Sequence, residues 1–202
     1  MNAPNRFLAV GLAAVLASNL ALAEETIVMI RHAEKPDAGL GQLSCQGLNR
    51  ALALPKVLLG KFATPASVFA PNPGVKKDDL GESYNYIRPL ATIEPTAIQL
   101  GIPVNTSIGF ENVISLEAAL LAPRYKDATV FVSWEHRLVE RAARNLVKQF
   151  GGDPSAVPVW DGYDFDSIYV VTLATDSHGK RSAKFRVEKE GLNGQPTSCP
   201  GS

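Results

Sequence analysis

Two charged or titratable side chains follow an apolar stretch near the start of the chain. Residues 26–30 read Thr-Ile-Val-Met-Ile, which is typical of a buried strand, and Arg31 and His32 come directly after them. Open α/β sheets bind their ligands at the carboxyl ends of their strands. A histidine at such a place can serve as a nucleophile, a base or a metal ligand. The alternative is a structural histidine that is hydrogen-bonded at the edge of a sheet.

A second histidine has the same position relative to another strand. Residues 128–133 form a strongly β-type run, and Trp134, Glu135 and His136 follow it. Residues 137–150 then have the apolar spacing of an amphipathic helix. Two parallel strands can therefore bring His32 and His136 to one edge of a sheet.

A third candidate, Arg88, lies at the amino-terminal end of a helical pattern. That pattern covers residues 87–100 and is interrupted at Pro95. Helix amino termini favour anions, and a guanidinium group can make paired hydrogen bonds to phosphate. Arg88 is therefore a candidate anion ligand, and the alternative is a surface salt bridge.

Strand and helix patterns alternate along the chain. This alternation predicts an α/β three-layer α/β/α sandwich, with a mostly parallel central sheet and an antiparallel C-terminal hairpin. The expected helix from Ser44 meets Pro55 and ends near Phe62, and Leu48, Ala51, Leu52 and Pro55 form its core face. The other expected strands are 67–70, 102–105, 167–175 and 181–188, and the other helical region is 106–122.

The stretch 71–86 reads as a long loop with two prolines, two glycines and several charges. Loops of this length in compact domains are often functional. We interpret it as a candidate lid over the site, with disorder as the alternative.

Residues 1–23 have the pattern of a secretory signal peptide. Arg6 precedes the apolar run 7–17, and Ala21-Leu22-Ala23 is a small-x-small cleavage site. The run is short for a membrane span, which needs about 20 apolar residues. We therefore expect a mature domain of residues 24–202 that is periplasmic or secreted, without stable membrane insertion after cleavage. An uncleaved anchor is the alternative.

The chain has two cysteines, Cys45 and Cys199. In an oxidising compartment such a pair is a disulfide candidate, and this bridge would tie the C-terminal tail to the first helix. The alternative is a pair of unpaired thiols.

Composition narrows the choice of partners. The 20 basic and 20 acidic residues cancel, so the sequence has no basic footprint for nucleic acid. Asp161, Asp164 and Asp166 lack the glycine and the terminal glutamate of a calcium loop, and we interpret them as turn and cap residues. His178 belongs to the turn of the C-terminal hairpin. We expect no metal site and no cofactor.

Four motifs in order resemble the histidine phosphatase superfamily, which has the phosphoglycerate-mutase-like fold. The resemblance covers roughly residues 26–150. The family's Arg-His-Gly signature differs from this chain only at Ala33, which adds a methyl group. The matching residues are Arg31-His32-Ala33-Glu34, then Leu43-Ser44, Gly47 and Arg50-Ala51, then Arg88 with Thr92, and finally Ser133-Trp134-Glu135-His136.

The resemblance implies a mechanism and a substrate class. Neutral His32 would attack phosphorus, Arg31 and Arg88 would bind the non-bridging oxygens, and His136 would stabilise the transition state. Water would then hydrolyse the phosphohistidine intermediate. The chain would be an exported bacterial phosphatase acting on a small phosphorylated substrate, an extracytoplasmic phosphomonoester, without a metal.

The proton donor to the leaving group stays open at this point. Glu111 is our preferred candidate, Glu135 and Glu34 are alternatives, and some short members of the family manage without a dedicated acid. Arg137 follows His136, so the aspartate that some members have there is absent. The rival function is a non-catalytic module of the same fold that binds a phosphate or another anion.

Overall fold

A six-stranded sheet organises the structure, a computed structural model that describes residues 24–201. Its strand order is β5-β2-β6-β1-β7-β8, with β5, β2, β6 and β1 parallel and β7 and β8 antiparallel. This confirms the predicted fold class. The strands are β1 (Glu24–Arg31), β2 (Ser67–Phe69), β5 (Val104–Asn105), β6 (Thr129–Trp134), β7 (Ser167–Thr175) and β8 (Arg181–Lys189). The predicted signal peptide lies outside the described residues.

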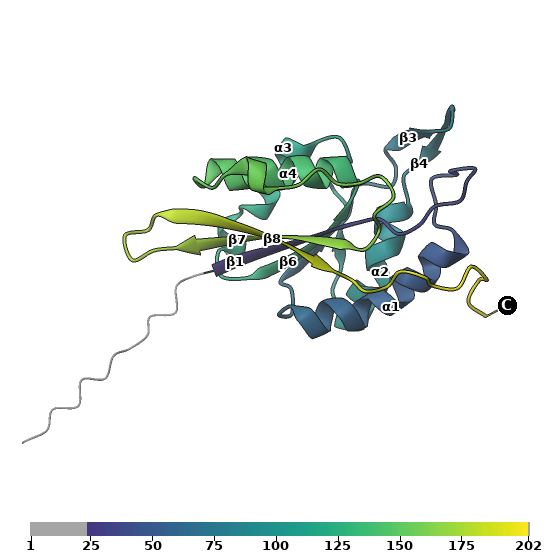
Figure 1. Cartoon of the computed structure of the whole chain (residues 1–202), viewed down its shortest axis with the longest axis horizontal. Coiled ribbons are helices and arrows are strands. Elements are labelled where there is room, and N and C mark those ends of the chain that lie inside the picture. Colours follow the sequence, from purple (N-terminus) through teal and green to yellow (C-terminus); the bar gives the residue numbers. More distant parts are fainter. Residues whose placement is uncertain (1–23, 202) are drawn as a thin grey trace, which may run out of the picture.

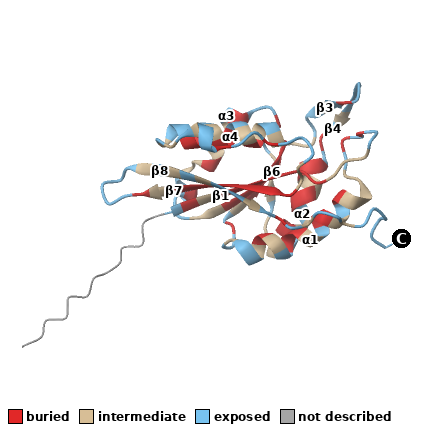
Figure 2. Ribbon diagram, in the orientation of Figure 1, coloured by how far each residue is buried: buried red, intermediate tan, exposed pale blue. Residues whose placement is uncertain are grey.

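Helices cover both faces of the sheet. Figure 1 shows α3 and α4 on one face and α1 and α2 on the other. Each face has its own apolar cluster, and Figure 2 shows the buried residues concentrated in the central strands and on the inner sides of the helices. The helices are α1 (Cys45–Lys61), α2 (Arg88–Leu100), α3 (Val113–Leu120) and α4 (His136–Gln149), with 3₁₀ turns at Pro123–Tyr125 and Pro154–Ala156. None of the helices described is long and apolar enough to span a membrane.

The first helix begins where the sequence predicts and buries a different face. The Ser44 hydroxyl accepts a hydrogen bond from the Gly47 N–H at 3.1 Å, as an N-cap does. The helix then continues through Pro55. Its buried residues are Gly47, Arg50, Ala51, Leu54, Pro55 and Leu58. Leu48 and Leu52 are exposed, so placing them on the core face was wrong, because the apolar stripe runs through Leu54 and Leu58 instead.

The stretch 71–86 is a small hairpin rather than an open loop. Strands β3 (Lys76–Asp79) and β4 (Glu82–Asn85) pair antiparallel around a turn at Leu80 and Gly81, which both have positive φ. The hairpin lies above the end of α2 in Figure 1. Only Asp79 of β3 is buried, so the hairpin is anchored by this side chain and not by an apolar face.

The C-terminal tail crosses back over α1. A disulfide joins Cys45 to Cys199, which confirms the predicted bridge. Asn49 donates hydrogen bonds to the carbonyls of Pro196 and Ser198 at 2.9 and 2.8 Å. The tail is thus held to the helix by covalent and polar contacts, and the predicted fraying of this segment is prevented.

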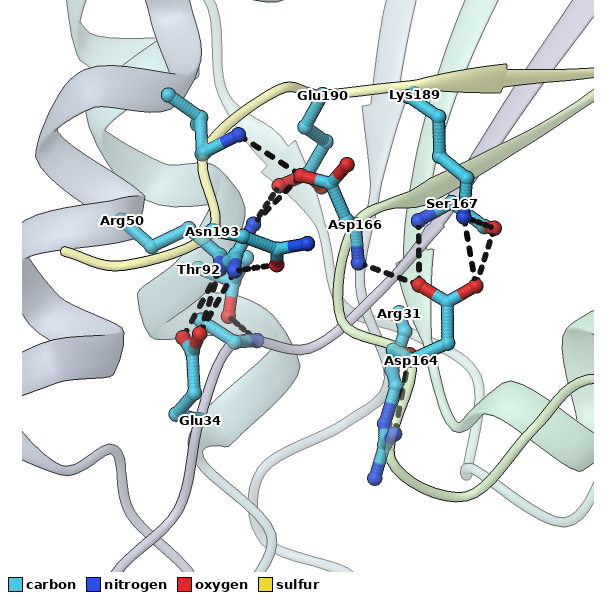
Figure 3. A network of polar contacts seen from close by, with 12 residues as sticks. Arg31, Glu34, Arg50, Thr92, Asp164, Asp166, Ser167, Lys189, Glu190 and Asn193 are labelled. Atoms are coloured by element: carbon cyan, nitrogen blue, oxygen red, sulfur yellow. Dashed lines mark hydrogen bonds and ion pairs between the residues drawn. The ribbon is translucent and has the colours of Figure 1, made fainter.

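A buried ionic network lies between α1 and the tail. Arg50 is 1% exposed and contacts Glu190 at 2.7 Å, Asp166 at 3.4 Å and Asn193 at 3.0 Å (Figure 3). Arg50 of the Arg50-Ala51 motif is therefore a buried hydrogen-bonding residue and does not lie on the surface. Asp161 and Asp164 accept hydrogen bonds within their own turn, as predicted. Within residues 24–201, no group of acidic, histidine or cysteine side chains could hold a metal ion.

Candidate active site

The two histidines are brought together by the parallel pairing of β1 and β6. Arg31 pairs with Trp134 in register, and the His32 N–H donates to the Trp134 carbonyl at 3.0 Å. His136 follows two residues later as the first residue of α4. Both side chains therefore lie at the carboxyl edge of the sheet, as the sequence predicts.

His32 has the protonation state of a nucleophile. Its Nδ1 lies 2.8 Å from the Ala33 carbonyl oxygen. A carbonyl only accepts hydrogen bonds, so Nδ1 carries the proton and Nε2 keeps its lone pair. Burial, followed by the charge of Arg88, holds the pKa of His32 well below its ordinary value. The ring is therefore neutral at physiological pH.

Arg31 is held against the loop that precedes β7. Its Nη1 donates to the carbonyls of Gly162 at 2.7 Å and Asp164 at 3.1 Å. The guanidinium lies over the Phe165 ring, with its central carbon 3.7 Å from the ring centroid. Burial lowers the pKa of Arg31 to about 10, so the group is charged at neutral pH. Its Nε is buried and has no hydrogen-bond partner among the described residues.

Arg88 approaches the site from the first turn of α2. Its Nη1 donates to Asp79 Oδ2 at 2.5 Å and to the Gly39 carbonyl at 3.4 Å. Thr92, one turn on, donates to the Arg88 carbonyl and accepts from the Ala33 N–H at 2.9 Å. This joins the turn after His32 to the helix that carries Arg88. The Nε of Arg88 is also buried without a partner in the described part of the chain.

Asp79 of the β3–β4 hairpin is a site residue that the sequence analysis missed. Besides Arg88 it contacts Lys35, whose Nζ lies 2.7 Å from Oδ1. Burial opposes the charge of this carboxylate, but hydrogen bonds from Lys35 and Arg88 lower its pKa. Gly39 passes so close that an added Cβ would lie 2.4 Å from the carboxylate carbon. The stretch was interpreted as a loop, so no strand register marked Asp79 as inward-facing.

Glu135 is paired with its neighbour His136. One carboxylate oxygen lies 2.8 Å from His136 Nδ1, and the other accepts from the Leu138 N–H at 3.1 Å, which caps α4. Burial opposes the charge, and the contact with His136 lowers the pKa of Glu135 below its ordinary value. The Glu135 carboxylate is therefore ionised and lies against the His136 ring, in a close contact whose geometry is not that of a hydrogen bond.

The other two carboxylates considered as proton donors have different surroundings. Glu111 is exposed and lines a cavity of about 320 Å³ together with Lys77, Glu135 and Arg137. Glu34 faces Arg50 in Figure 3, and the Arg50 Nε and Nη2 atoms donate to its carboxylate at 2.7–3.0 Å. The Glu111 carboxylate therefore makes no hydrogen bond or ion pair with the described residues and shares a cavity with Glu135, the neighbour of His136, whereas Glu34 is engaged in the buried network.

Tyr86 is a second residue that the sequence analysis missed. It is fully buried, and its ring meets the His32 ring edge-on at a centroid distance of 5.9 Å. The central carbon of the Arg88 guanidinium lies 5.0 Å from the Tyr86 ring centroid. The hydroxyl has no hydrogen-bond partner among residues 24–201, and burial raises its pKa. Its position two residues before Arg88 was the available signal.

The polar atoms around His32 form an incomplete hydrogen-bonding set. Arg31 Nε, Arg88 Nε and the Tyr86 hydroxyl are all buried donors without partners in the described residues. Buried donors in folded proteins are nearly always satisfied, so such a group of them calls for an explanation. An oxyanion beside His32 would accept hydrogen bonds from donors of this kind. The positive charge of the two arginines would repel a metal cation.

Solved structures share this fold. No family model and no curated protein sequence matches the chain. The candidate phosphohistidine phosphatase SixA from Nakamurella multipartitia is 19% identical, with 82% of this chain and 95% of that chain covered and a TM-score of 0.53. A mycobacterial glucosyl-3-phosphoglycerate phosphatase is 14% identical, with 81% of this chain and 97% of that chain covered and a TM-score of 0.52. The chain therefore has the fold of these phosphatases, as the resemblance implied.

Proposed function

We propose that the chain is a metal-independent phosphohydrolase that cleaves a phosphomonoester through a phosphohistidine intermediate on His32. The observation that carries this proposal is the set of unpartnered buried donors beside a neutral histidine whose Nε2 bears a lone pair. A phosphoryl group in transfer spreads its charge over three oxygens and needs such donors. The names of the matched structures support the same reaction class, and one of them holds inorganic phosphate.

The first step of the proposed reaction transfers the phosphoryl group to the protein. Nε2 of His32 forms a bond to phosphorus while the bond to the leaving oxygen breaks. Arg31 and Arg88 bind the non-bridging oxygens, and His136 at the first turn of α4 donates to the same oxygens. The leaving oxygen takes a proton from Glu111.

The second step regenerates the enzyme. A water molecule attacks phosphorus, Glu111 accepts its proton, and the bond between phosphorus and Nε2 breaks. Inorganic phosphate leaves and His32 returns to its neutral form. Glu111 suits this role because its carboxylate has no partner among the described residues and lines a cavity with Glu135 and Arg137, the two neighbours of His136, whereas Glu135 lies against His136 and Glu34 is paired with Arg50.

We also propose that the protein acts outside the cytoplasm. The leader pattern of residues 1–23 supports export. The disulfide between Cys45 and Cys199 suits an oxidising compartment. Alkaline phosphatase fusions to the first 30 residues would test this, because the reporter becomes active only after export, and a fusion that is produced but stays inactive would contradict the proposal.

The test of the enzymatic proposal is phosphate release from p-nitrophenyl phosphate by the mature protein, with and without EDTA. We expect turnover that survives EDTA and disappears in His32→Ala. Rapid quenching in base should trap an acid-labile phosphohistidine in the wild type only. Inorganic phosphate binding without turnover of any phosphoester would instead favour the anion-binding module.

A further inference from the structure

We propose that Arg137 and Arg141 bind a second oxyanion on the leaving group, so that the natural substrate carries a carboxylate or phosphate besides the phosphoryl group that is removed. This inference rests on the proposed phosphatase function and adds a substrate class to it. It begins from two cavities that meet at the first turns of α4, next to His136.

Both arginines line both cavities. The larger, of about 510 Å³, also includes His136 and Gly162, whose carbonyl holds Arg31. The smaller includes Glu111, the proposed proton donor. A leaving group that extends from His32 into either cavity therefore passes Arg137 and Arg141. Trp160 and Val159 give the larger cavity an apolar wall for the carbon skeleton between the two anions.

The two guanidinium groups are not engaged by the protein. Arg137 and Arg141 are exposed and make no hydrogen bond or ion pair with the described residues, although the charge of Arg141 acts on Glu117. Arg144, one turn further along the helix, is by contrast neutralised, because its Nε lies 3.0 Å from Glu140 Oε1. The other oxygen of Glu140 accepts a hydrogen bond from the Trp160 N–H. The other charged groups that line the two cavities beside the arginines are Glu111, Glu135, Glu140, Lys77 and Arg144.

The placement of these charges is unfavourable for the helix itself. Arg137 lies in the first turn of α4, where the helix dipole disfavours cations, and the acidic cap Glu135 is already engaged by the Leu138 N–H and by His136. Arg141 is four residues later, so the two like charges face each other across one turn. A helix selected only for stability would carry acids at these positions. The arrangement is explained if a bound anion neutralises the pair.

The helix also sets the distance between the two anions. Arg141 is five residues from His136, which is about 7.5 Å along the axis. A flexible arginine can thus meet an anion roughly 6–10 Å from the reacting phosphorus. Short phosphorylated acids and bisphosphates have this separation.

Binding and turnover test this inference separately. Calorimetry would compare 4-phosphonobutanoate with butylphosphonate, which differ in the remote carboxylate, on the full mature protein. We expect the wild type to bind the carboxylate compound at least tenfold more tightly at low salt. In Arg137→Gln/Arg141→Gln the difference should fall below twofold, and Lys148→Gln, which removes one charge from the far end of α4, should keep it. Equal binding of both compounds by the wild type, or an undiminished preference in the double variant, would overturn the inference.

The matching esters extend the test to catalysis. Two alkyl phosphates would be compared, one ending in a carboxylate and one in a hydroxyl. The ratio of their kcat/KM values should favour the carboxylate ester in the wild type and in Lys148→Gln, and should fall below twofold in Arg137→Gln/Arg141→Gln. The kcat/KM of the hydroxyl ester in the double variant should stay within twofold of the wild-type value. A wild type that binds both phosphonates but turns over neither ester would contradict the phosphatase proposal and leave the binding result to decide on the arginines.

The unpartnered hydroxyl of Tyr86 carries a second, independent inference. We infer that this hydroxyl donates a hydrogen bond to the phosphoryl group during transfer. The ring is fixed by edge contacts with His32 at 5.9 Å and Phe110 at 5.2 Å. Burial raises the pKa of the hydroxyl, and the nearby Arg88 guanidinium, which can only donate to the hydroxyl oxygen, opposes that rise and leaves the hydroxyl proton free to donate.

A tyrosine with only a structural role would not be expected to leave its hydroxyl buried and unsatisfied. Phenylalanine would keep every ring contact and remove the unpaired polar atom. The retained hydroxyl is explained if it gains its partner when the phosphoryl group is bound.

Tyr86→Phe is therefore expected to melt at the same temperature as the wild type or higher, while its kcat falls at least tenfold and its KM stays within twofold. It should also lose affinity for vanadate more than for phosphate. Tyr169→Phe is the matched control, because the Tyr169 hydroxyl is satisfied by the Pro158 carbonyl at 3.1 Å and so has no unmet hydrogen bond to offer a substrate. The control should lose stability and keep kcat. A Tyr86→Phe variant with unchanged kcat and vanadate affinity would overturn the inference.

Discussion

The backbone N–H of His32 donates to the carbonyl of Trp134 at 3.0 Å, which extends the ladder between β1 and β6 by one residue beyond the strands. This bond fixes the two strand ends against each other. His136 begins α4 two residues after Trp134, so its distance from His32 is set by the backbone and not by side-chain contacts. The positions of both histidines should therefore tolerate substitution of either side chain.

Replacement of His136 by alanine should lower kcat for p-nitrophenyl phosphate by about 10²–10³, the usual loss for one donor to a developing negative charge. The fold should persist, because the β1–β6 ladder holds both strand ends. Steady-state kinetics and circular dichroism melts would check this. His136→Asn serves as a partial replacement that keeps a donor. A rise in KM at constant kcat would show that His136 only binds the ground state.

Glu111→Gln should slow hydrolysis of an alkyl phosphate by about 10²-fold or more, the usual contribution of a general acid. The loss should be much smaller with p-nitrophenyl phosphate, because p-nitrophenolate leaves without needing a proton. Parallel kinetics on the two esters would measure the difference. An equal loss on both esters would mean that Glu111 does not protonate the leaving group.

Glu34→Gln is the control for Glu111→Gln, because it makes the same chemical change on a carboxylate that faces Arg50. It should unfold more easily by about 3 kcal/mol, because it breaks a largely buried ion pair. Its kcat on the alkyl ester should stay within about threefold. Urea unfolding would give the stability, and a selective loss of kcat without a loss of stability would point to Glu34 as the acid.

The positions of His32 and His136 could be predicted because the signals are local. The β-type runs before His32 and His136 define strand ends, and alternation with helices makes those strands parallel. The pairing of Arg31 with Trp134 then follows from topology. The role of each histidine did not follow from this pattern and came from the resemblance.

The β3–β4 hairpin could not be predicted in the same way. Its strands read Lys-Lys-Asp-Asp and Glu-Ser-Tyr-Asn, with no apolar alternation that a sequence pattern could detect. What fixes it is the contact of Asp79 with Arg88 and Lys35. The partners of Arg50 were likewise hidden, since Asp166 and Glu190 are 116 and 140 residues away in the chain.

Asp79→Asn should bind inorganic phosphate more tightly, by about three- to tenfold. The Asp79 carboxylate occupies a donor of Arg88 and repels an incoming anion, so its removal frees that donor. Titration calorimetry near pH 7 would measure the change, and Asp78→Asn, on the opposite side of the same strand, is the control. Weaker phosphate binding in Asp79→Asn would mean that the carboxylate positions Arg88 for the substrate.

Glu190 should make the stability of the protein depend on pH. Burial, helped by the charges of Asp166 and Glu34 and opposed by Arg50, raises its pKa to about 8. The folded state therefore binds more protons than the unfolded state between about pH 4.5 and pH 8. The stability that Glu190 contributes is fully present below pH 4.5 and is lost as the pH rises through 8.

Urea unfolding at pH 5 and pH 8 would measure this contribution in wild type and Glu190→Gln. We expect the wild type to lose about 3–4 kcal/mol more than the variant between the two pH values, since a neutral amide does not titrate. Glu188→Gln, two residues earlier on β8 and more exposed, should lose as much as the wild type. The opposite result would be a wild type that gains stability over Glu190→Gln when the pH is raised from 5 to 8. It would show that Arg50 keeps the Glu190 carboxylate ionised.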